Sequence, residues 1–441
     1  MKKVYIETLG CQMNKSDTEK LYGMLECLNY IQVDEPKCAT DADLLIINTC
    51  SIRQLSEDKA FSRIGTWGKW KEQNPNLKIV FCGCVAQDKG KTVFRRAPYV
   101  DLVMGTHNIN EFPDLLKQIE QDEKVYANGE TPIPERDYAQ KRVKSVNAWI
   151  PITEGCDNFC TYCIVPYTRG RERSRDPQKI IAEVKQALKE GFKEVTLLGQ
   201  NVDSYGKKGE YTDWNLARLL REINKIEGKF RIRFTTSYPT DITDELIQTA
   251  RESDKVCECF HIPMQSGSSV ILKKMNRRYD RDQYSQIVKK VRDSIEDVTI
   301  TSDFIVGFPS ETEEQFQETL SAMREYSLDY SNTASYSPRE KTIAARMVEE
   351  FIPEEVKERR LEEINSQNKE NCYKSNEKYV GRVMEVLIDS FYEHKGQKIN
   401  TGRTRNNKIV HIPHNEDLTG QFLDVKITGL KTWYLKGELN G

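Results

Sequence analysis

The stretch Cys156-Asp-Asn-Phe-Cys160-Thr-Tyr-Cys163 places three thiols within eight consecutive residues of a 441-residue chain. Three thiolates at this spacing can wrap one side of a compact inorganic cluster. A structural zinc ion needs a fourth ligand, usually from a second Cys or His pair, and none follows nearby. Iron–sulfur cubanes normally take four cysteines, so three leave one iron open. We interpret the motif as a cluster site, with a closed zinc site and chance burial of cysteines as alternatives.

The composition excludes several classes of protein. Lys plus Arg number 66 against 68 for Asp plus Glu, so bulk charge does not favour binding to nucleic acid, and any such binding has to come from local basic patches. No apolar run approaches the roughly 20 residues of a membrane span, and Glu7 interrupts the first apolar stretch, so we expect no signal peptide and a cytosolic protein. The 12 cysteines in a reducing compartment indicate metal ligation or thiol chemistry. At about 150 residues per domain, the length suggests about three domains.

The first third of the chain repeats one pattern three times: a β-rich run, a cysteine and a helical stretch. The expected strands are 3–6, 42–48 and 78–81, the first two helices are 18–28 and 56–67, and the cysteines are Cys11, Cys50 and Cys84. Continuous β-branched runs alternating with helices predict a doubly wound parallel sheet. Because the carboxyl ends of parallel strands share one edge, we expect the three thiols to converge there.

The sequence of the remaining chain predicts a linker, an α/β barrel and a small β-barrel. A polar stretch with two prolines, 122–145, is typical of a linker. Beyond it, strand-like runs alternate with helical patterns, which favours a partial α/β barrel, and a charged helix follows from Pro353 to about residue 375. Short alternating strands after Tyr379 are typical of a small β-barrel. The predicted strands are 149–152, 194–198, 231–236, 259–262, 298–306, 382–388 and 422–427, with helices at 177–190 and 313–326. We therefore divide the chain into a domain at 1–120, a linker at 121–145, a core at 146–372 and a terminal barrel at 375–438.

The CxxxCxxC motif resembles the signature of the radical S-adenosylmethionine (SAM) enzymes, and wider motifs resemble their methylthiotransferase branch. The tail resembles a TRAM domain, a small RNA-binding β-barrel. The matching segments are 152–175 around the motif, Gly10-Cys11-Gln-Met-Asn14, Asn48-Thr-Cys50-Ser-Ile-Arg53 and Gly83-Cys84-Val-Ala86. The resemblance implies two 4Fe-4S clusters, one on Cys156, Cys160 and Cys163 that binds SAM at its open iron, and an auxiliary one on Cys11, Cys50 and Cys84.

Within the branch, the motifs after Gly10 and Asn48 are similar to those of bacterial enzymes acting on tRNA. This implies radical methylthiolation of carbon 2 of N6-isopentenyladenosine at position 37 in the anticodon loop, with the radical abstracting hydrogen and a second SAM supplying the methyl group. A one-electron reductant protein is a further implied partner, and the sulfur source stays open. The alternatives are a methylthiotransferase acting on threonylcarbamoyl-adenosine tRNA or a ribosomal protein, and a non-catalytic iron–sulfur or zinc RNA-binding protein.

Two segments depart from the family pattern. Glu340-Lys341-Thr342 stands where Pro-Gly-Thr is usual, and Ser310 stands where Gly is common. We expect both to lie away from the cysteines, leaving the chemistry intact and altering only local loops.

Polar residues after the barrel strands are the predicted SAM contacts, because that edge of a barrel carries function. A surface turn is the alternative for each of them. The predicted cofactor-binding residues are Gln200, Asn201, Ser237, Gln265, Asp303 and Arg169. Arg169 begins a run with Arg171, Arg173 and Arg175 that we expect to contact phosphate or the SAM carboxylate, with arginines that simply face solvent as the alternative.

In the tail, we predict that Arg403, Arg405 and Lys408 contact the RNA backbone, with a solvated loop as the alternative. Rings for base stacking are available from Tyr392, Trp433 and Tyr434. The other six cysteines (Cys27, Cys38, Cys82, Cys257, Cys259 and Cys372) are assigned to packing, because free Cys is commonly buried.

Overall fold

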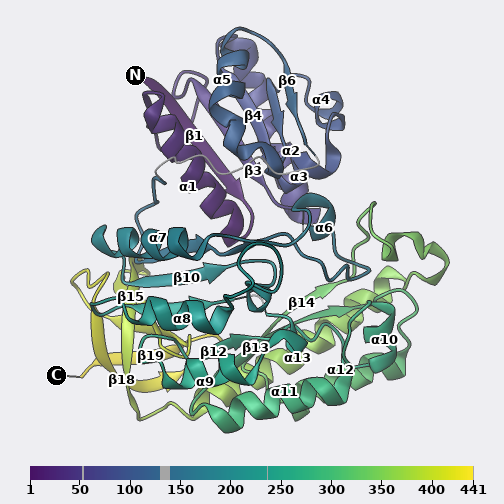
Figure 1. Ribbon diagram of the computed structural model, residues 1–441, viewed down its shortest axis with the longest axis vertical. Helices are drawn as coiled ribbons and strands as arrows, with labels where there is room; N and C mark the ends of the chain where they lie inside the picture. Colours follow the sequence, from purple (N-terminus) through teal and green to yellow (C-terminus); the bar gives the residue numbers. More distant parts are fainter. Residues whose placement is uncertain (52–53, 130–139, 236, 441) are drawn as a thin grey trace. The chain divides into compact units, whose positions relative to one another are not determined.

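The computed structural model describes residues 1–51, 54–129, 140–235 and 237–440 (Figure 1). Three sequence predictions include residues outside these ranges: the motif 48–53, the strand 231–236 and the linker 121–145. The chain divides into two compact units. The first unit comprises 1–144, 154–157 and 163–172, and the second comprises 145–153, 158–162 and 173–441.

The first unit is built on a six-stranded parallel sheet of order β2-β1-β3-β4-β5-β6. Its strands are β1 (Lys2–Leu9), β2 (Tyr30–Gln32), β3 (Leu44–Thr49), β4 (Lys78–Gly83), β5 (Leu102–Met104) and β6 (Val125–Ala127). Its helices are α1 (Gln12–Cys27), α2 (Gln54–Gln73), α3 (Cys84–Lys89), α4 (Thr92–Arg96), the 3-10 helix η1 (Thr106–Glu111), α5 (Phe112–Glu120) and α6 (Val165–Thr168).

Alternation along β3 explains why helices cover both faces of this sheet. Leu44 and Ile46 pack with α1 and α5, whereas Leu45 and Ile47 pack on the other side with Trp67 of α2. Successive side chains of a strand point to opposite faces, so a continuous apolar run requires cover on both. The doubly wound sheet predicted from these runs is confirmed.

The second unit begins with an open, partial α/β barrel. Its six parallel strands form two three-stranded sheets, β11-β10-β7 and β12-β13-β14. An isolated parallel bridge pairs Ile232 of β11 with Val256, three residues before β12. The strands are β7 (Asn147–Pro151), β10 (Glu194–Leu198), β11 (Arg231–Phe234), β12 (Cys259–His261), β13 (Thr299–Val306) and β14 (Tyr330–Ser335), with short β8 (Thr153–Glu154) and β9 (Arg173–Ser174). The helices are α7 (Pro177–Lys189), η2 (Val202–Ser204), α8 (Leu216–Asn224), η3 (Pro239–Asp241), α9 (Asp244–Glu252), α10 (Ser269–Lys274), α11 (Arg281–Ser294), α12 (Glu313–Glu325), η4 (Ala344–Arg346), η5 (Val348–Glu350) and α13 (Glu354–Glu377).

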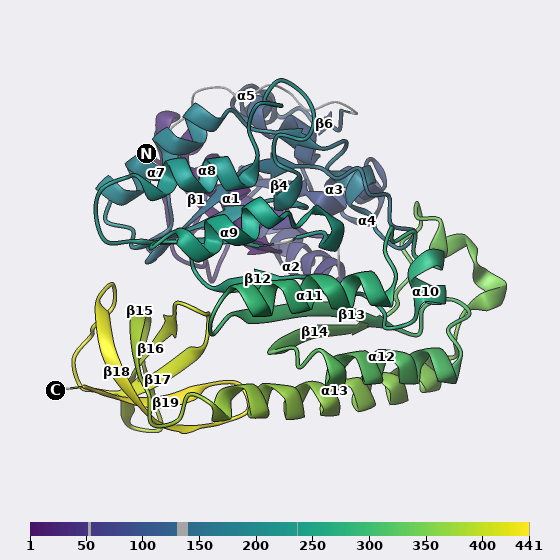
Figure 2. The ribbon, with the colours of Figure 1, turned by 60° about the horizontal axis from the view of Figure 1, so that its bottom comes forward.

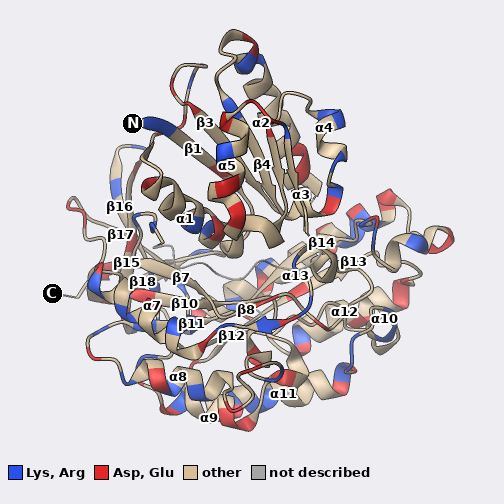
Figure 3. Cartoon of the chain, turned by 45° about the horizontal axis from the view of Figure 1, so that its top comes forward, with Lys and Arg blue, Asp and Glu red and all other residues tan. Residues whose placement is uncertain are grey.

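The outer helices are amphipathic, and Figure 3 shows acidic and basic residues interspersed along α8, α9, α11 and α12. Their apolar sides join one core with the barrel strands; Leu219 of α8, Tyr284 of α11 and Phe316 of α12 are fully buried in it. The predicted α/β barrel is confirmed, and it is incomplete.

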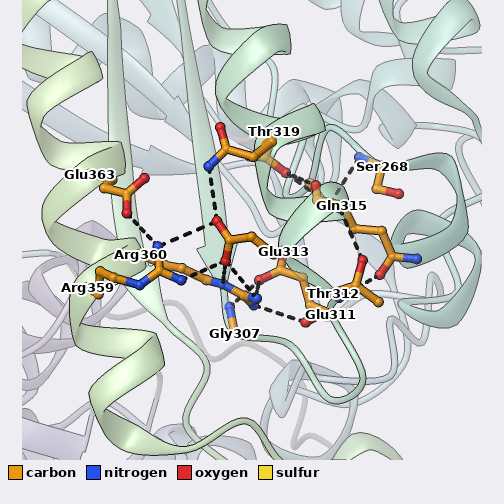
Figure 4. Close-up of polar contacts among 12 residues, drawn as sticks. Ser268, Gly307, Glu311, Thr312, Glu313, Gln315, Thr319, Arg359, Arg360 and Glu363 are labelled. Atoms are coloured by element: carbon orange, nitrogen blue, oxygen red, sulfur yellow. Dashed lines mark hydrogen bonds and ion pairs between the residues drawn. The ribbon is translucent and has the colours of Figure 1, made fainter.

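A buried ion-pair network fixes the start of α12 against α13 (Figure 4). Glu311 accepts hydrogen bonds from Gly307 N at 2.7 Å and from Arg360 Nη1 at 2.9 Å. Both side chains are almost fully buried. Arg360 and the neighbouring Arg359 of α13 also contact Glu313 in the first turn of α12. The network therefore anchors the loop that follows β13.

A closed five-stranded barrel of order β15-β16-β17-β19-β18 completes the second unit. Figure 2 shows α13 leading into it. Its strands are β15 (Val383–His394), β16 (Gln397–Thr404), β17 (Ile409–Pro413), β18 (Phe422–Leu430) and β19 (Leu435–Leu439), and Val386, Val410 and Val425 lie in its core. The predicted small barrel is confirmed. No helix in the described ranges has both the length and the apolarity to span a bilayer.

Candidate functional site

The three N-terminal cysteines follow three neighbouring parallel strands at the same level. Residues Leu9, Thr49 and Gly83 are aligned across β1, β3 and β4. Cys50 and Cys84 come directly after the last two, and Cys11 comes two residues after Leu9. Cys50 and Cys84 are buried and Cys11 is half-buried. The strand register therefore brings the three predicted positions to one edge of the sheet.

Two asparagines from the sequence motifs connect these cysteine segments. Asn14 Oδ1 accepts hydrogen bonds from Cys11 N at 3.2 Å and from Cys11 Sγ at 3.4 Å, while its Nδ2 donates to Asn48 Oδ1 at 3.1 Å. Asn48 Nδ2 donates back to the Asn14 carbonyl at 2.9 Å. Gly83 has φ +93, and a Cβ there would lie 2.5 Å from Asn48 Oδ1. Only glycine fits that position without strain.

The structure corrects the predicted start of one helix, and Asn14 explains the difference. The helix expected from residue 18 begins at Gln12, with Cys11 as its N-cap residue. The bond from Cys11 N to Asn14 is a local capping contact, which hydrophobic periodicity does not reveal.

A buried positive charge accompanies the N-terminal thiols. Arg169 Nη2 lies 2.6 Å from Asp17 Oδ2, and both side chains are buried. The pKa of the Cys11 thiol is lowered to about 6, mainly by a hydrogen bond with Cys50 and also by the charge of Arg169, while burial acts in the opposite direction. Metal ligation requires the thiolate, so this environment suits the donor set of an iron–sulfur cluster. The side chain predicted to contact SAM thus lies, in this structure, with the N-terminal cysteines.

The start of the second cysteine motif is held by contacts within the first unit. Cys156 N donates to the Gly170 carbonyl at 3.2 Å, and Asp157 Oδ1 accepts from Glu172 N at 3.3 Å. Gly155 has φ +79, and a Cβ there would lie 2.2 Å from the Arg171 carbonyl oxygen. Glycine is therefore required where the chain turns into the motif.

The middle of the motif is held by the residues that end α10, all within the second unit. Thr161 N donates to the Met275 carbonyl at 3.0 Å, and its hydroxyl donates to the Lys274 carbonyl at 2.9 Å. Asn276 Nδ2 donates to the Phe159 carbonyl at 3.0 Å, where the backbone has φ 47. Next to it, Arg277 Nη1 lies 3.5 Å from Cys160 Sγ. Sequence reasoning missed these residues because they are more than a hundred positions away along the chain.

The loops that depart from the family pattern are not remote from the cysteines, which corrects our expectation. Ala344 N, two residues after Thr342, donates to the carbonyl of Thr161, beside Cys160, at 2.9 Å. Ser310 has φ 64, a conformation that favours glycine, and its hydroxyl bonds to Lys274 Nζ. The segment 340–342 is therefore linked through Ala344, and Ser310 through Lys274, to the loop that carries Cys160.

A polar network lies on the inner face of the partial barrel. His261 Nε2 lies 3.2 Å from Asp303 Oδ2, and its Nδ1 lies 2.9 Å from Thr301 Oγ1. Asn332 Nδ2 donates to Asp303 Oδ1 at 2.9 Å. Burial opposes the charge of Asp303, but the hydrogen bond and charge of His261 outweigh it, so the pKa of Asp303 is lowered. Of these residues, sequence analysis singled out only Asp303.

The other predicted SAM contacts lie just beyond the barrel strands. Asn201 is buried, and its Nδ2 donates to Asp241 Oδ2 at 2.6 Å. Ser237 N donates to the His261 carbonyl at 3.2 Å. Gln200 directly follows Gly199, and Gln265 has φ 75 and pairs with Phe304 of β13. A cavity of about 310 Å³ adjoins this edge, lined among others by Asp203, Tyr205, Trp214 and Asp241.

Two of the basic residues predicted to contact RNA are engaged within the second unit instead. Arg405 donates to Glu258 Oε1 at 2.6 Å, and Lys408 is buried with its Nζ 3.3 Å from Asp329 Oδ1. Both contacts hold the hairpin on the core. The buried Lys408 is therefore neither in a solvated loop nor able to reach RNA, whereas an RNA contact of Arg405, whose side chain is 30% exposed, stays a prediction. Arg403 remains 40% exposed.

The aromatic residues predicted to stack bases lie on the terminal barrel. Tyr434 stacks on His411 with ring centroids 3.9 Å apart. Tyr392 and Trp433 are exposed.

The remaining cysteines divide into two groups. Cys82, Cys257 and Cys372 are buried and Cys259 is half-buried, as predicted. Cys27 and Cys38 are exposed, which corrects the prediction that they pack in a core. Cys27 ends α1 and Cys38 lies in the turn before β3. Among the described residues, no three His, Cys, Asp or Glu side chains already take up the geometry of a single-ion site.

Three family models match the chain: the Radical SAM superfamily over residues 150–323, the uncharacterized protein family UPF0004 over 3–105, and the TRAM domain over 377–439. The chain is 47% identical over 440 residues to the "tRNA-2-methylthio-N(6)-dimethylallyladenosine synthase" of Thermoanaerobacter sp. (strain X514), covering 99% of this chain and 92% of that protein. It is 44% identical to the protein of that name from Clostridium perfringens (strain 13 / Type A), covering 99% and 98%.

Two solved structures share the fold at low sequence identity. The radical S-adenosylmethionine methyltransferase TsrM from Kitasatospora setae has a TM-score of 0.58 at 12% identity, covering 78% of this chain and 77% of that one. The cobalamin-dependent S-adenosylmethionine radical enzyme OxsB has a TM-score of 0.53 at 14% identity, covering 81% and 56%.

Proposed function

This chain belongs to the family of tRNA-2-methylthio-N(6)-dimethylallyladenosine synthases, and we propose that its two groups of three cysteines divide the work of the reaction. It is a radical SAM methylthiotransferase that acts on tRNA. Cys156, Cys160 and Cys163 are assigned to a 4Fe-4S cluster with SAM at its open iron. Cys11, Cys50 and Cys84 are assigned to an auxiliary 4Fe-4S cluster.

The observation that supports the auxiliary assignment is the alignment of β1, β3 and β4, which delivers three thiols to one edge beside Arg169. A 4Fe-4S cluster there would supply the site from which sulfur is inserted. The chain's own part is to favour the thiolate of Cys11, whose pKa is lowered, while burial raises the pKa of the Cys84 thiol and the charge of Arg169 opposes that rise. Asn14 orients Cys11 through its backbone and thiol, and the Arg169–Asp17 pair places a fixed positive charge beside the thiolates.

The cluster on Cys156, Cys160 and Cys163 would supply the electron that cleaves SAM into a carbon radical. The end of α10 shapes the loop that carries Cys160 through Thr161 and Asn276. The polar residues at the open end of the barrel, Gln200, Asn201, Ser237, Gln265 and Asp303, are assigned to SAM. Asp303 is kept ionised by His261, so it is suited to accept hydrogen bonds from the amine or ribose hydroxyls of that cofactor.

We assign the modified nucleotide as adenosine 37 of the tRNA anticodon loop, which carries an isopentenyl group at N6. Chemistry at carbon 2 of a base requires that the base be unstacked into a pocket, and a loop nucleotide costs less to expose than a paired one. We assign RNA binding to the terminal barrel, with Tyr392, Trp433 and Tyr434 as its stacking rings. A one-electron reductant protein and a cytoplasmic location complete the proposal.

The experiment that tests the proposal is mass spectrometry of tRNA nucleosides after incubation with anaerobically reconstituted protein, dithionite and SAM. The expected product is 2-methylthio-N6-isopentenyladenosine, with no product when the tRNA lacks the isopentenyl group. A methylthio group on threonylcarbamoyl-adenosine, or on a ribosomal protein, would refute the substrate assignment. Tightly bound zinc with no SAM cleavage would refute the enzymatic assignment.

A further inference from the structure

The guanidinium of Arg277, which lies just after α10, makes three polar contacts. Its Nη1 lies 3.5 Å from Cys160 Sγ. Its Nε donates to the Tyr279 hydroxyl at 2.7 Å, and its Nη2 donates to the Pro263 carbonyl at 2.9 Å. The guanidinium is planar and rigid. Its bonds to Tyr279 and Pro263 therefore also fix the direction of Nη1, which points toward the sulfur of Cys160.

Two tyrosine rings enclose the same charge. The guanidinium carbon of Arg277 lies 4.4 Å from the ring centroid of Tyr238 and 4.9 Å from that of Tyr279. The two rings pack edge to face, and Tyr238 and Tyr279 are buried. Two rings placed in this way attract a cation by their quadrupoles and reduce its screening by water.

No carboxylate in the described part of the chain forms an ion pair with Arg277; Asp303 acts on it only at longer range. The Arg277 side chain is half-buried, and a charge withdrawn from water in this way usually pairs with an opposite charge, because leaving it unpaired is costly. Here the group at the third donor is the sulfur of a cysteine assigned to a cluster. The sulfur of Cys160 therefore takes the place that a carboxylate would usually have beside the positive charge of Arg277.

We propose that Arg277 is a positioning residue that raises the reduction potential of the cluster on Cys156, Cys160 and Cys163. The inference rests on the proposed assignment of that cluster. One-electron reduction takes an electron from an external reductant and adds one negative charge to the cluster and its thiolates, with no bond made or broken. A hydrogen bond to a ligand sulfur and a fixed positive charge both stabilise the more negative state, and such contacts tune cluster potentials.

The test is an EPR-monitored redox titration of the reconstituted full-length protein without SAM, following the signal that changes when SAM is later added. Arg277→Gln keeps donors but loses the charge, and Arg277→Lys keeps the charge but loses the fork. We expect Arg277→Gln to lower the ratio of reduced to oxidised cluster at a fixed potential by about tenfold, which is a midpoint about 59 mV more negative for one electron. Arg277→Lys is expected to shift the midpoint by less. The matched control is Arg278→Gln, an exposed neighbouring charge, which should leave the midpoint unchanged.

Three results would overturn the inference. An unchanged midpoint in Arg277→Gln at full iron content would show that the charge does not act on the cluster. Loss of iron in both Arg277 variants would show that Arg277 only holds the cysteine loop in place. A weaker SAM affinity at an unchanged midpoint would make Arg277 a SAM contact. If the unaltered protein neither binds iron at the central motif nor cleaves SAM, the proposed function fails first, so the two failures are distinguishable.

Discussion

The buried carboxyl group of Asp203 makes stability depend on pH in a way that can be calculated. Asp203 lies in η2, just after β10, and is 5% exposed. Burial raises its pKa from 3.8 to about 7, and the Ser237 hydroxyl offsets only part of this effect. Because the folded-state pKa is above the unfolded value, the protonated group favours folding at low pH, and this contribution is lost as the pH rises through about 7.

The expected magnitude follows from the two pKa values. At 1.36 kcal/mol for each unit, the contribution of Asp203 to the free energy of unfolding falls by about 2.5 kcal/mol between pH 5 and pH 8. In Asp203→Asn this part of the pH dependence disappears. The measurement is urea unfolding of the apoprotein at the two pH values, followed by hydrogen exchange in peptides that span β10 and β11.

The matched control is Asp213→Asn, which neutralises a carboxylate with a 69% exposed side chain. It should keep the pH dependence of the unaltered protein. The reasoning about Asp203 is refuted if Asp203→Asn and the unaltered protein lose the same stability between pH 5 and pH 8. That result would mean that Asp203 is ionised in the folded state throughout this range.

Three further variants test the packing of the second unit. Arg360→Ala leaves Glu311 buried without its arginine partner and should lower the unfolding free energy by about 3–5 kcal/mol. Arg359→Ala removes a solvent-exposed ion pair and should lower it much less; equal losses in urea unfolding would contradict this. Arg233→Ala removes the donors to the carbonyls of Thr404 and Arg405 at 2.9 and 2.8 Å, so limited proteolysis should release the terminal barrel faster, and an unchanged rate would argue against this contact. Gly267→Ala places a Cβ 2.5 Å from the Glu318 carbonyl oxygen and should cost about 1–3 kcal/mol, measured as a lower midpoint in the same urea assay; an unchanged midpoint would show that α12 moves aside freely.

The parts of the fold that follow local patterns were predictable from the sequence. The run Leu44–Thr49 is apolar on both sides, which already requires a sheet covered on both faces. The cysteine after each of three such strands then marks the functional edge, since parallel strands end together. The helix boundaries were less accurate, because the start of α1 depends on the capping contact of Asn14 with Cys11.

The parts that depend on distant packing were not predictable. Arg277 meets Cys160 across 117 positions of sequence, and no spacing rule connects them. Arg405 and Lys408 look like a basic hairpin, yet Glu258 and Asp329 of the core neutralise them. Cys27 and Cys38 were assigned to packing from the usual burial of free cysteine, and their exposure depends on where α1 ends and on a local turn.

The division of labour between the two cysteine groups is tested most directly by the triple variant Cys11→Ala, Cys50→Ala, Cys84→Ala. Reconstituted unaltered protein should bind about eight irons and the triple variant about four, as expected for two and one 4Fe-4S clusters. We expect the variant still to cleave SAM while the tRNA gains no methylthio group. Loss of SAM cleavage with the central iron retained, or continued formation of the methylthio nucleoside, would contradict it.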